Sequence, residues 1–156
     1  MKKSYLILGL GALAFMIYSK YKVFWDKISF SVKNVKVKTQ LPYTEFQIVI
    51  TIEANNPTDT SVTLNSTNGV LLLQGKKIAN ISGGSAIIKK GKTPFDVIAT
   101  ISHQDILNIS STKFDTSKIT NFLNQLINES FTTDMIFDTS LGRFSSKDSW
   151  KIKDFA

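Results

Sequence analysis

Alternation of apolar and polar residues is the feature that most restricts what this chain can fold into. In the stretch TEFQIVITIEANN every second residue from Phe46 to Ile52 is a large apolar one, and mostly polar residues lie between them. The stretch PFDVIATIS repeats the pattern from Phe95 to Ile101. A period of two places the apolar side chains on one face of a β-strand, so both stretches predict half-buried strands.

Shorter segments of the same character predict more strands, over residues 28–38, 61–65, 69–74, 78–82, 85–90, 131–138 and 149–153. Residues that favour turns separate them, namely Asn56-Pro57, Gly75, Gly83-Gly84 and Gly91. Many short strands at such spacing are typical of an antiparallel β-sandwich. No alternation of strand and helix is present, which disfavours a parallel nucleotide-binding sheet.

One segment departs from this period. In DTSKITNFLNQLINES the apolar residues recur at helical spacing, at Ile119, Phe122, Leu123, Leu126 and Ile127. The pattern predicts an amphipathic helix over about 115–128, which we expect to cover an open end or edge of the sandwich. A partner-binding or membrane-surface helix is the alternative. Just before it, the sequence Ser-His-Gln-Asp at 102–105 fits a capping box and predicts a short helical turn.

The chain begins MKKSYLILGLGALAFMIYSKYK, in which the sixteen residues from Ser4 to Ser19 carry no charge. As a helix they would span about 24 Å, slightly less than the ~30 Å hydrocarbon core of a bilayer. Flanking lysines can extend to the head groups. We therefore predict a membrane anchor made by Tyr5, Leu6, Ile7, Leu8, Leu10, Leu13, Phe15, Met16, Ile17 and Tyr18. The predicted interface residues are Lys2, Lys3, Lys20, Lys22 and Trp25.

Two other interpretations of this segment stay open. Ala12-Leu13-Ala14 resembles a signal-peptide cleavage site, although bulky apolar residues continue beyond it. A helix buried against protein is also compatible. We favour the anchor, which divides the chain into a membrane segment with its juxtamembrane part (1–27) and a β-domain (28–156). The predicted location is a membrane, crossed once near the N-terminus, with the side of the membrane undetermined because lysines flank both ends.

The positive charge of the chain does not indicate nucleic-acid binding. Residues 1–27 contain five lysines against Asp26 and hold +4 of the total of +7. This excess flanks the apolar segment, where cations meet phospholipid head groups. Of the 19 basic residues only Arg143 is an arginine, whereas the bidentate arginine fork is the usual reader of bases and phosphates. We therefore expect a lipid bilayer as a partner, and no nucleic acid.

No pattern of residues indicates an enzyme. The sequence has no cysteine and one histidine, His103, and its twelve acidic residues are scattered without a calcium-loop motif. Nucleophile-elbow, phosphate-loop and dinucleotide motifs are missing too. We expect no catalytic residues, no metal, no cofactor and no small-molecule substrate. One basic cluster, Lys89, Lys90 and Lys92 around Gly91, is a candidate contact hairpin for anionic lipid or an acidic partner. The simpler interpretation is a solvated turn that protects strand ends.

The order of these features resembles a known family. A strand ending in Asn56-Pro57, a strand running into Gly75, a hairpin containing Gly91 and a helical turn bearing Leu107 are similar to the WHy (water stress and hypersensitive response) domain of late-embryogenesis-abundant proteins. The tail DTSLGRFSSKDSWKIKDF is similar to the closing hairpin of that domain. The resemblance covers roughly residues 28–155. It implies an Ig-like β-sandwich, often anchored or secreted, associated with desiccation, envelope stress or lipid contact, and it brings no catalytic residues.

These observations predict a non-enzymatic, membrane-anchored accessory or structural protein, which presents a β-domain at a membrane within an envelope or a larger assembly of proteins. Two alternatives stay open. One is a module that binds lipid or another apolar ligand, related to stress-protective proteins. The other is a structural component of a membrane-containing virus particle, since a short anchor beside a small β-domain also suits that setting.

Overall fold

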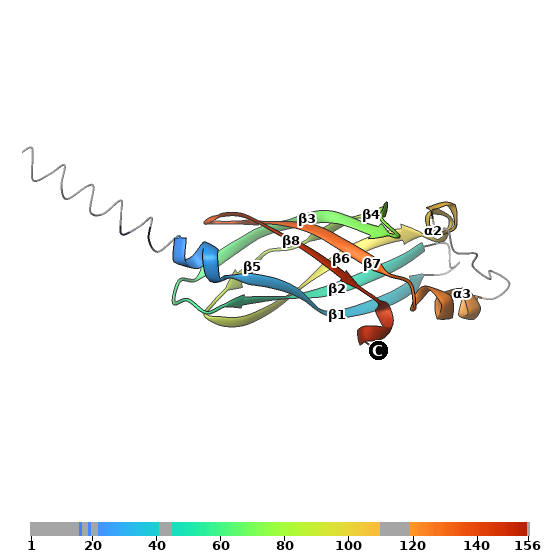
Figure 1. Cartoon of the computed structure of the whole chain (residues 1–156), viewed down its shortest axis with the longest axis horizontal. Helices are drawn as coiled ribbons and strands as arrows, with labels where there is room; N and C mark the ends of the chain where they lie inside the picture. The colour runs from blue at the N-terminus through green and yellow to red at the C-terminus, as the bar shows by residue number, and fades with distance from the viewer. Residues whose placement is uncertain (1–15, 17–18, 20–21, 41–44, 110–118, 156) are drawn as a thin grey trace, which may run out of the picture.

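The structure is a computed structural model, which describes residues 16, 19, 22–40, 45–109 and 119–155. Antiparallel strands dominate the fold, as the alternation predicted. The strands are β1 (Ser29–Gln40), β2 (Glu45–Asn56), β3 (Val62–Leu73), β4 (Lys76–Gly83), β5 (Ala86–Ile88), β6 (Gly91–Ser102), β7 (Phe131–Thr139) and β8 (Gly142–Trp150). They form an elongated body with short helical elements at its two ends (Figure 1).

The strands belong to one curled sheet, where the sequence predicted the two separate sheets of a sandwich. Their order is β1-β2-β6-β4-β3-β7-β8, and β5 pairs with β3 beside β4. Strand β4 links the group β1-β2-β6 to the group β3-β7-β8. It pairs with β3 from Leu73 back to Thr67, and with β6 at Ile81 to Gly83. Because β4 is hydrogen-bonded to both groups, the backbone hydrogen bonds continue around the curl. The apolar faces of the two groups face each other and enclose a single core.

The two edge strands of this sheet, β1 and β8, approach each other and run in the same direction along the body (Figure 1). They meet through side chains: the hydroxyl of Ser146 donates to the carbonyl oxygen of Phe30 at 3.3 Å. The ring centroids of Phe30 and Phe144 lie 5.8 Å apart. Curling thus brings the first and last strands together and covers apolar surface that a flat sheet would leave in water.

Two of the sequence predictions for strands were wrong in detail. The segments 61–65 and 69–74 belong to one strand, β3, whose register shifts between Leu64 and Ser66. The predicted strand 149–153 is also displaced, since β8 ends at Trp150 and a 3-10 helix, η1 (Ile152–Phe155), follows. In β8 the outward positions carry serine and charged residues, and two of the inward positions are also polar, Ser146 and Asp148. Few large apolar side chains therefore mark this segment as a strand.

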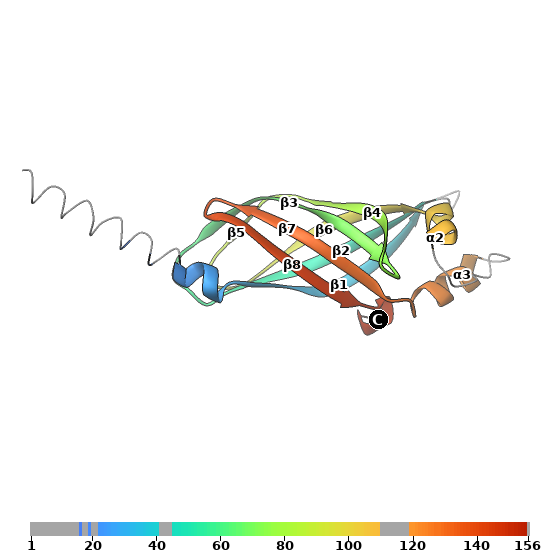
Figure 2. The same cartoon turned by 45° about the horizontal axis from the view of Figure 1, so that its top comes forward.

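Two short helices lie together at one end of the body, which we call the helix end (Figures 1 and 2). They are α2 (His103–Ile109) and α3 (Ile119–Leu126). The predicted cap of α2 is present, since the backbone N–H of Asp105 donates to the hydroxyl of Ser102 at 3.0 Å. Ile106 of α2 and Leu126 of α3 are buried in the core. Of the predicted 115–128 helix, residues 115–118 lie outside the described part.

The opposite end, which we call the entry end, is where the N-terminal part of the chain joins the sheet. It contains a helical turn over 22–27, the loop 57–60 between β2 and β3, the 89–90 turn, and the Ser140-Leu141 turn. Asn56, which is completely buried, organises the loop: its side-chain amide donates to the carbonyl oxygen of Thr60 at 2.7 Å and its oxygen accepts the N–H of Thr58 at 3.0 Å. The sequence predicted this role for Asn56-Pro57.

Candidate functional site

The helical turn over 22–27 is held against the sheet by two aromatic side chains. Phe24 is completely buried and meets the ring of Phe144 edge-on, with centroids 5.5 Å apart. Trp25 stacks on the ring of Phe144 too, with centroids 4.1 Å apart and planes inclined by 26°. The backbone N–H of Ile28 donates to the carbonyl oxygen of Phe24 at 2.9 Å and continues the turn into β1. We call the surface of Phe144 and Gly142 that receives these rings the aromatic socket.

Gly142 is required in the aromatic socket for two reasons. Its φ is +124°, a backbone conformation that residues other than glycine rarely adopt. A Cβ at this position would also overlap the six-membered ring of Trp25. The Ser140-Leu141 turn before it is braced by Thr139, whose hydroxyl donates to the carbonyl oxygen of Gly142 at 2.7 Å. The turn therefore presents a flat backbone surface on which the indole lies.

From the aromatic socket, stacked rings continue into the core. Phe30 lies parallel to Phe137, with centroids 4.0 Å apart and planes inclined by 9°. Phe95 meets both rings edge-on, at 6.4 Å from Phe30 and 6.0 Å from Phe137. Phe144 contacts Phe30 as well as the residues of the helical turn. The N-terminal segment is thereby connected to β1, β6, β7 and β8 through one cluster of aromatic rings.

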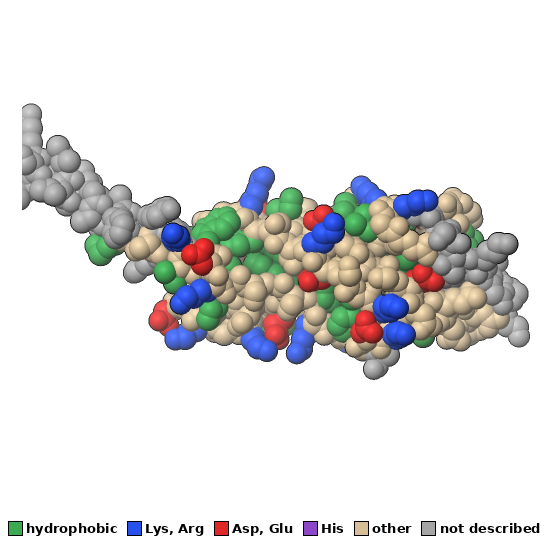
Figure 3. All heavy atoms as spheres, viewed as in Figure 1, with side chains coloured by type: hydrophobic (Ala, Val, Ile, Leu, Met, Phe, Trp, Pro, Cys, Tyr) green, Lys and Arg blue, Asp and Glu red, His purple; other side chains and the backbone are tan. Residues whose placement is uncertain are grey.

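The predicted anchor lies almost entirely outside the described residues, and so do the interface residues Lys2, Lys3 and Lys20. Within the described part, no helix is both long and apolar enough to cross a bilayer. Met16 and Val23 are exposed, by 56% and 45%, and Trp25 by 41%. Trp25 therefore has one face against Phe144 and another open to the surroundings. Apolar side chains gather at this end of the face in view (Figure 3).

In the candidate contact hairpin, two of the three lysines pair with carboxylates. The ammonium of Lys90 lies 2.6 Å from a carboxylate oxygen of Asp59, and that of Lys92 lies 3.1 Å from Glu53. The hydrogen bond and the charge of Lys90 lower the pKa of Asp59 below its ordinary value. Lys89 is exposed. The first pair connects the 89–90 turn to the loop 57–60, and the second connects β6 to β2. Together they offset most of the charge that the sequence suggested.

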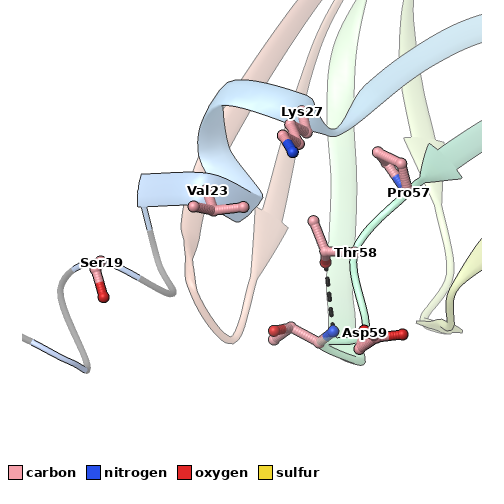
Figure 4. Close-up of a pocket in the computed structure, with 7 residues that line it drawn as sticks. Ser19, Val23, Lys27, Pro57, Thr58 and Asp59 are labelled. Atoms are coloured by element: carbon pink, nitrogen blue, oxygen red, sulfur yellow. Dashed lines mark hydrogen bonds between the residues drawn. The ribbon is translucent and has the colours of Figure 1, made fainter.

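A hollow of about 590 Å³ lies between the helical turn and the loop 57–60. Ser19, Val23 and Lys27 line it from one face of the N-terminal helical segment, because they recur at intervals of four residues. Pro57 to Thr60 line it from the other side. The ammonium of Lys27 points into the hollow, on the opposite side of which lies Thr58 (Figure 4). The hollow is therefore lined by one cation, Lys27, one carboxylate, Asp59, three hydroxyl groups and two apolar side chains.

Potential metal ligands do not cluster in the described part of the chain. No group of three or more His, Cys, Asp or Glu side chains lies close enough there to hold a metal ion. His103 opens α2 at the helix end. The residues of the entry end offer ion pairing, hydrogen bonding and apolar contact to a ligand.

The sequence did not reveal the aromatic socket. Trp25 follows Lys20 and Lys22, and this pattern predicts an interfacial tryptophan. Its partner Phe144 lies in a strand whose apolar signal is weak. The one available signal was Phe24, a large apolar residue just after the lysines, in a turn that would otherwise be solvated. Its burial could not be inferred without the position of β8.

No protein-family model matches the chain, and no curated protein matches it. Several solved structures are similar to it at low identity. A crystal structure of a protein from Archaeoglobus fulgidus has 10% identity, with 78% of this chain and 97% of that chain covered and a TM-score of 0.47. A solution structure of a putative late-embryogenesis-abundant protein has 14% identity, covers 97% of this chain and 92% of its own, and has a TM-score of 0.42.

A solution structure of a protein from Arabidopsis thaliana has 16% identity, with 81% of this chain and 85% of that chain covered and a TM-score of 0.45. At these identities and scores, the likeness carries no argument about what this chain does. The fold class that the strands themselves define is an antiparallel β-domain built on one curled sheet.

Proposed function

We propose that this chain is a non-enzymatic structural protein that is anchored in a membrane by its N-terminal segment and presents its β-domain at the membrane surface within an envelope or a larger assembly. The observation that carries the proposal is the aromatic socket. The uncharged stretch from Ser4 to Ser19 leads into a helical turn that Phe24 and Trp25 fix to the sheet. A fixed junction of this kind suits a β-domain that is held close to a membrane surface.

The packing of the core favours a structural role over that of a lipid carrier. At the entry end, the rings of Phe30 and Phe137 are in direct stacking contact, and Phe95 closes against both. A carrier of apolar ligands needs interior space for its cargo, whereas these rings occupy the space between the opposed faces of the sheet. The role in a virus particle is a special case of the assembly proposed here, and the neighbours of the protein decide it.

Membrane extraction of the full chain tests the anchor. We expect the protein to stay in the membrane pellet after washing with alkaline carbonate and to enter solution only with detergent. A variant with charges in the apolar stretch, Leu8→Asp with Leu13→Asp, should move to the soluble fraction, because a buried charge costs about 2.5–3.5 kcal/mol at the centre of a membrane helix. Wild-type protein with an intact N-terminus in the soluble fraction would contradict the proposal.

Cross-linking in native membranes tests the assembly. We expect discrete cross-linked products that contain other proteins, formed through the lysines of the β-domain, among which Lys36, Lys38 and Lys77 are exposed. The contrary result is an absence of cross-linked products although the same lysines react with a soluble amine reagent. That result would contradict the proposed assembly and leave the proposed anchor untouched.

A further inference from the structure

The hollow between the helical turn and the loop 57–60 lies at the point where the chain leaves the β-domain toward its uncharged stretch. If that stretch enters a bilayer, as proposed above, the hollow lies at the level of the phospholipid head groups. Its volume of about 590 Å³ falls in the range of about 300–1,000 Å³ that small-molecule sites occupy. We infer that it binds the phosphodiester group of an anionic phospholipid.

Lys27 supplies the charge that such a ligand needs. Its side chain points into the hollow (Figure 4), and among the described residues no ion pair engages it. The one acidic residue of the lining, Asp59, is already paired with Lys90 at 2.6 Å. The carboxylate is thus compensated by a cation outside the lining, and Lys27 leaves a net positive charge facing the space.

The other lining residues suit the remainder of a lipid head group. Thr60 contributes a hydroxyl group, and such groups hydrogen-bond to phosphate oxygens in many sites. The hydroxyl of Thr58 donates to the side-chain oxygen of Asn56 at 2.7 Å and so helps to hold the loop. Val23 and Pro57 contribute apolar surface beside them, where the glycerol and the first methylene groups of a lipid would lie. The loop is held in place by the buried amide of Asn56, so this half of the hollow is formed before any ligand binds.

The test uses full-length protein in nanodiscs made of phosphatidylcholine with or without phosphatidylglycerol, followed by native mass spectrometry that counts retained lipid. We expect wild-type protein to retain phosphatidylglycerol in preference to phosphatidylcholine. The variant Lys27→Gln should retain it about fivefold less, the effect of one lysine near a lipid surface. Lys38→Gln, an exposed lysine toward the helix end of β1, is the matched control and should behave as wild type.

Three results would overturn the inference: equal retention by Lys27→Gln and wild type, no preference for phosphatidylglycerol, or displacement of the lipid by millimolar inorganic phosphate, which would assign the hollow to free phosphate. Because Lys27 is exposed, its variant should unfold at the wild-type temperature, so a loss of lipid is not a loss of fold. The inference rests on the proposed anchor, and carbonate extraction separates the two. Extraction of wild-type protein refutes the anchor, whereas a retained chain without bound phosphatidylglycerol refutes the lipid site alone.

Discussion

The two ends of the β-domain are closed in different ways. At the helix end the sheet is covered by α2 and α3, which the chain inserts between β6 and β7, and each contributes a buried aliphatic residue, Ile106 and Leu126. At the entry end β7 and β8 are joined by the two-residue turn Ser140-Leu141, and the cover comes from the segment that precedes the sheet. The stability of the β-domain at the entry end therefore depends on the residues that lead to the predicted anchor.

The largest expected effect concerns the core beneath each end. Phe137→Ala removes a completely buried ring that stacks on Phe30 and meets Phe95, and should lower the free energy of unfolding by about 3–5 kcal/mol. Leu126→Ala at the helix end should fall at the lower part of its range of about 2–5 kcal/mol, because Leu126 is the last residue of a helix of 8 residues that can shift to fill the space. Denaturant unfolding of the full chain in detergent measures both, and equal losses would contradict the comparison.

The aromatic socket should show the next largest effect. Gly142→Ala forces a side chain into a positive φ and into the indole of Trp25, so we expect a loss of about 1–3 kcal/mol. The control is Gly84→Ala, since a Cβ there meets nothing within 4 Å and its φ is not positive. Combining Gly142→Ala with Trp25→Ala should cost less than the sum of the two by at least about 0.5 kcal/mol. Additive losses would mean that the indole does not rest on Gly142.

Local side-chain caps provide a third, smaller contrast. At the entry end, Asn56→Ala leaves the carbonyl oxygen of Thr60 and the N–H of Thr58 without their partner and should cost about 1–3 kcal/mol. At the helix end, Ser102→Ala removes the cap of α2 and should cost about 1 kcal/mol. Thermal unfolding compares the two variants. A larger loss from Ser102→Ala than from Asn56→Ala would contradict this order.

The smallest effect concerns the ion pair between Lys90 and Asp59. Since Lys90 lowers the pKa of Asp59 in the folded protein, the pair stabilises the fold above the unfolded-state pKa of about 3.9. That contribution disappears as the pH falls through the lower folded-state pKa. Wild type and Lys90→Gln should therefore differ slightly in unfolding temperature near neutral pH and converge in acid. Lys89→Gln, the exposed neighbour, should show no such pH dependence.

Alternation allowed most strands to be predicted because it is a local signal: each half-buried strand shows its own buried face. The signal was strongest in β2, where buried and half-buried residues alternate along almost the whole strand. It was weak in β8, whose residues between Phe144 and Trp150 are serines, a lysine and an aspartate, and there the prediction was displaced. Asn56 was also predictable, since its hydrogen bonds reach only four residues along the chain.

By itself, then, the sequence determined the antiparallel β class, the turn at Asn56-Pro57 and the cap of α2, because each depends on residues near one another in the chain. Only the tertiary structure decided that the strands form one curled sheet, that β1 meets β8, and that Trp25 lies on Gly142. The contact of Ser146 with Phe30 joins residues 116 positions apart. No local pattern encodes such a pairing, because it exists only once the intervening strands have curled around a common core.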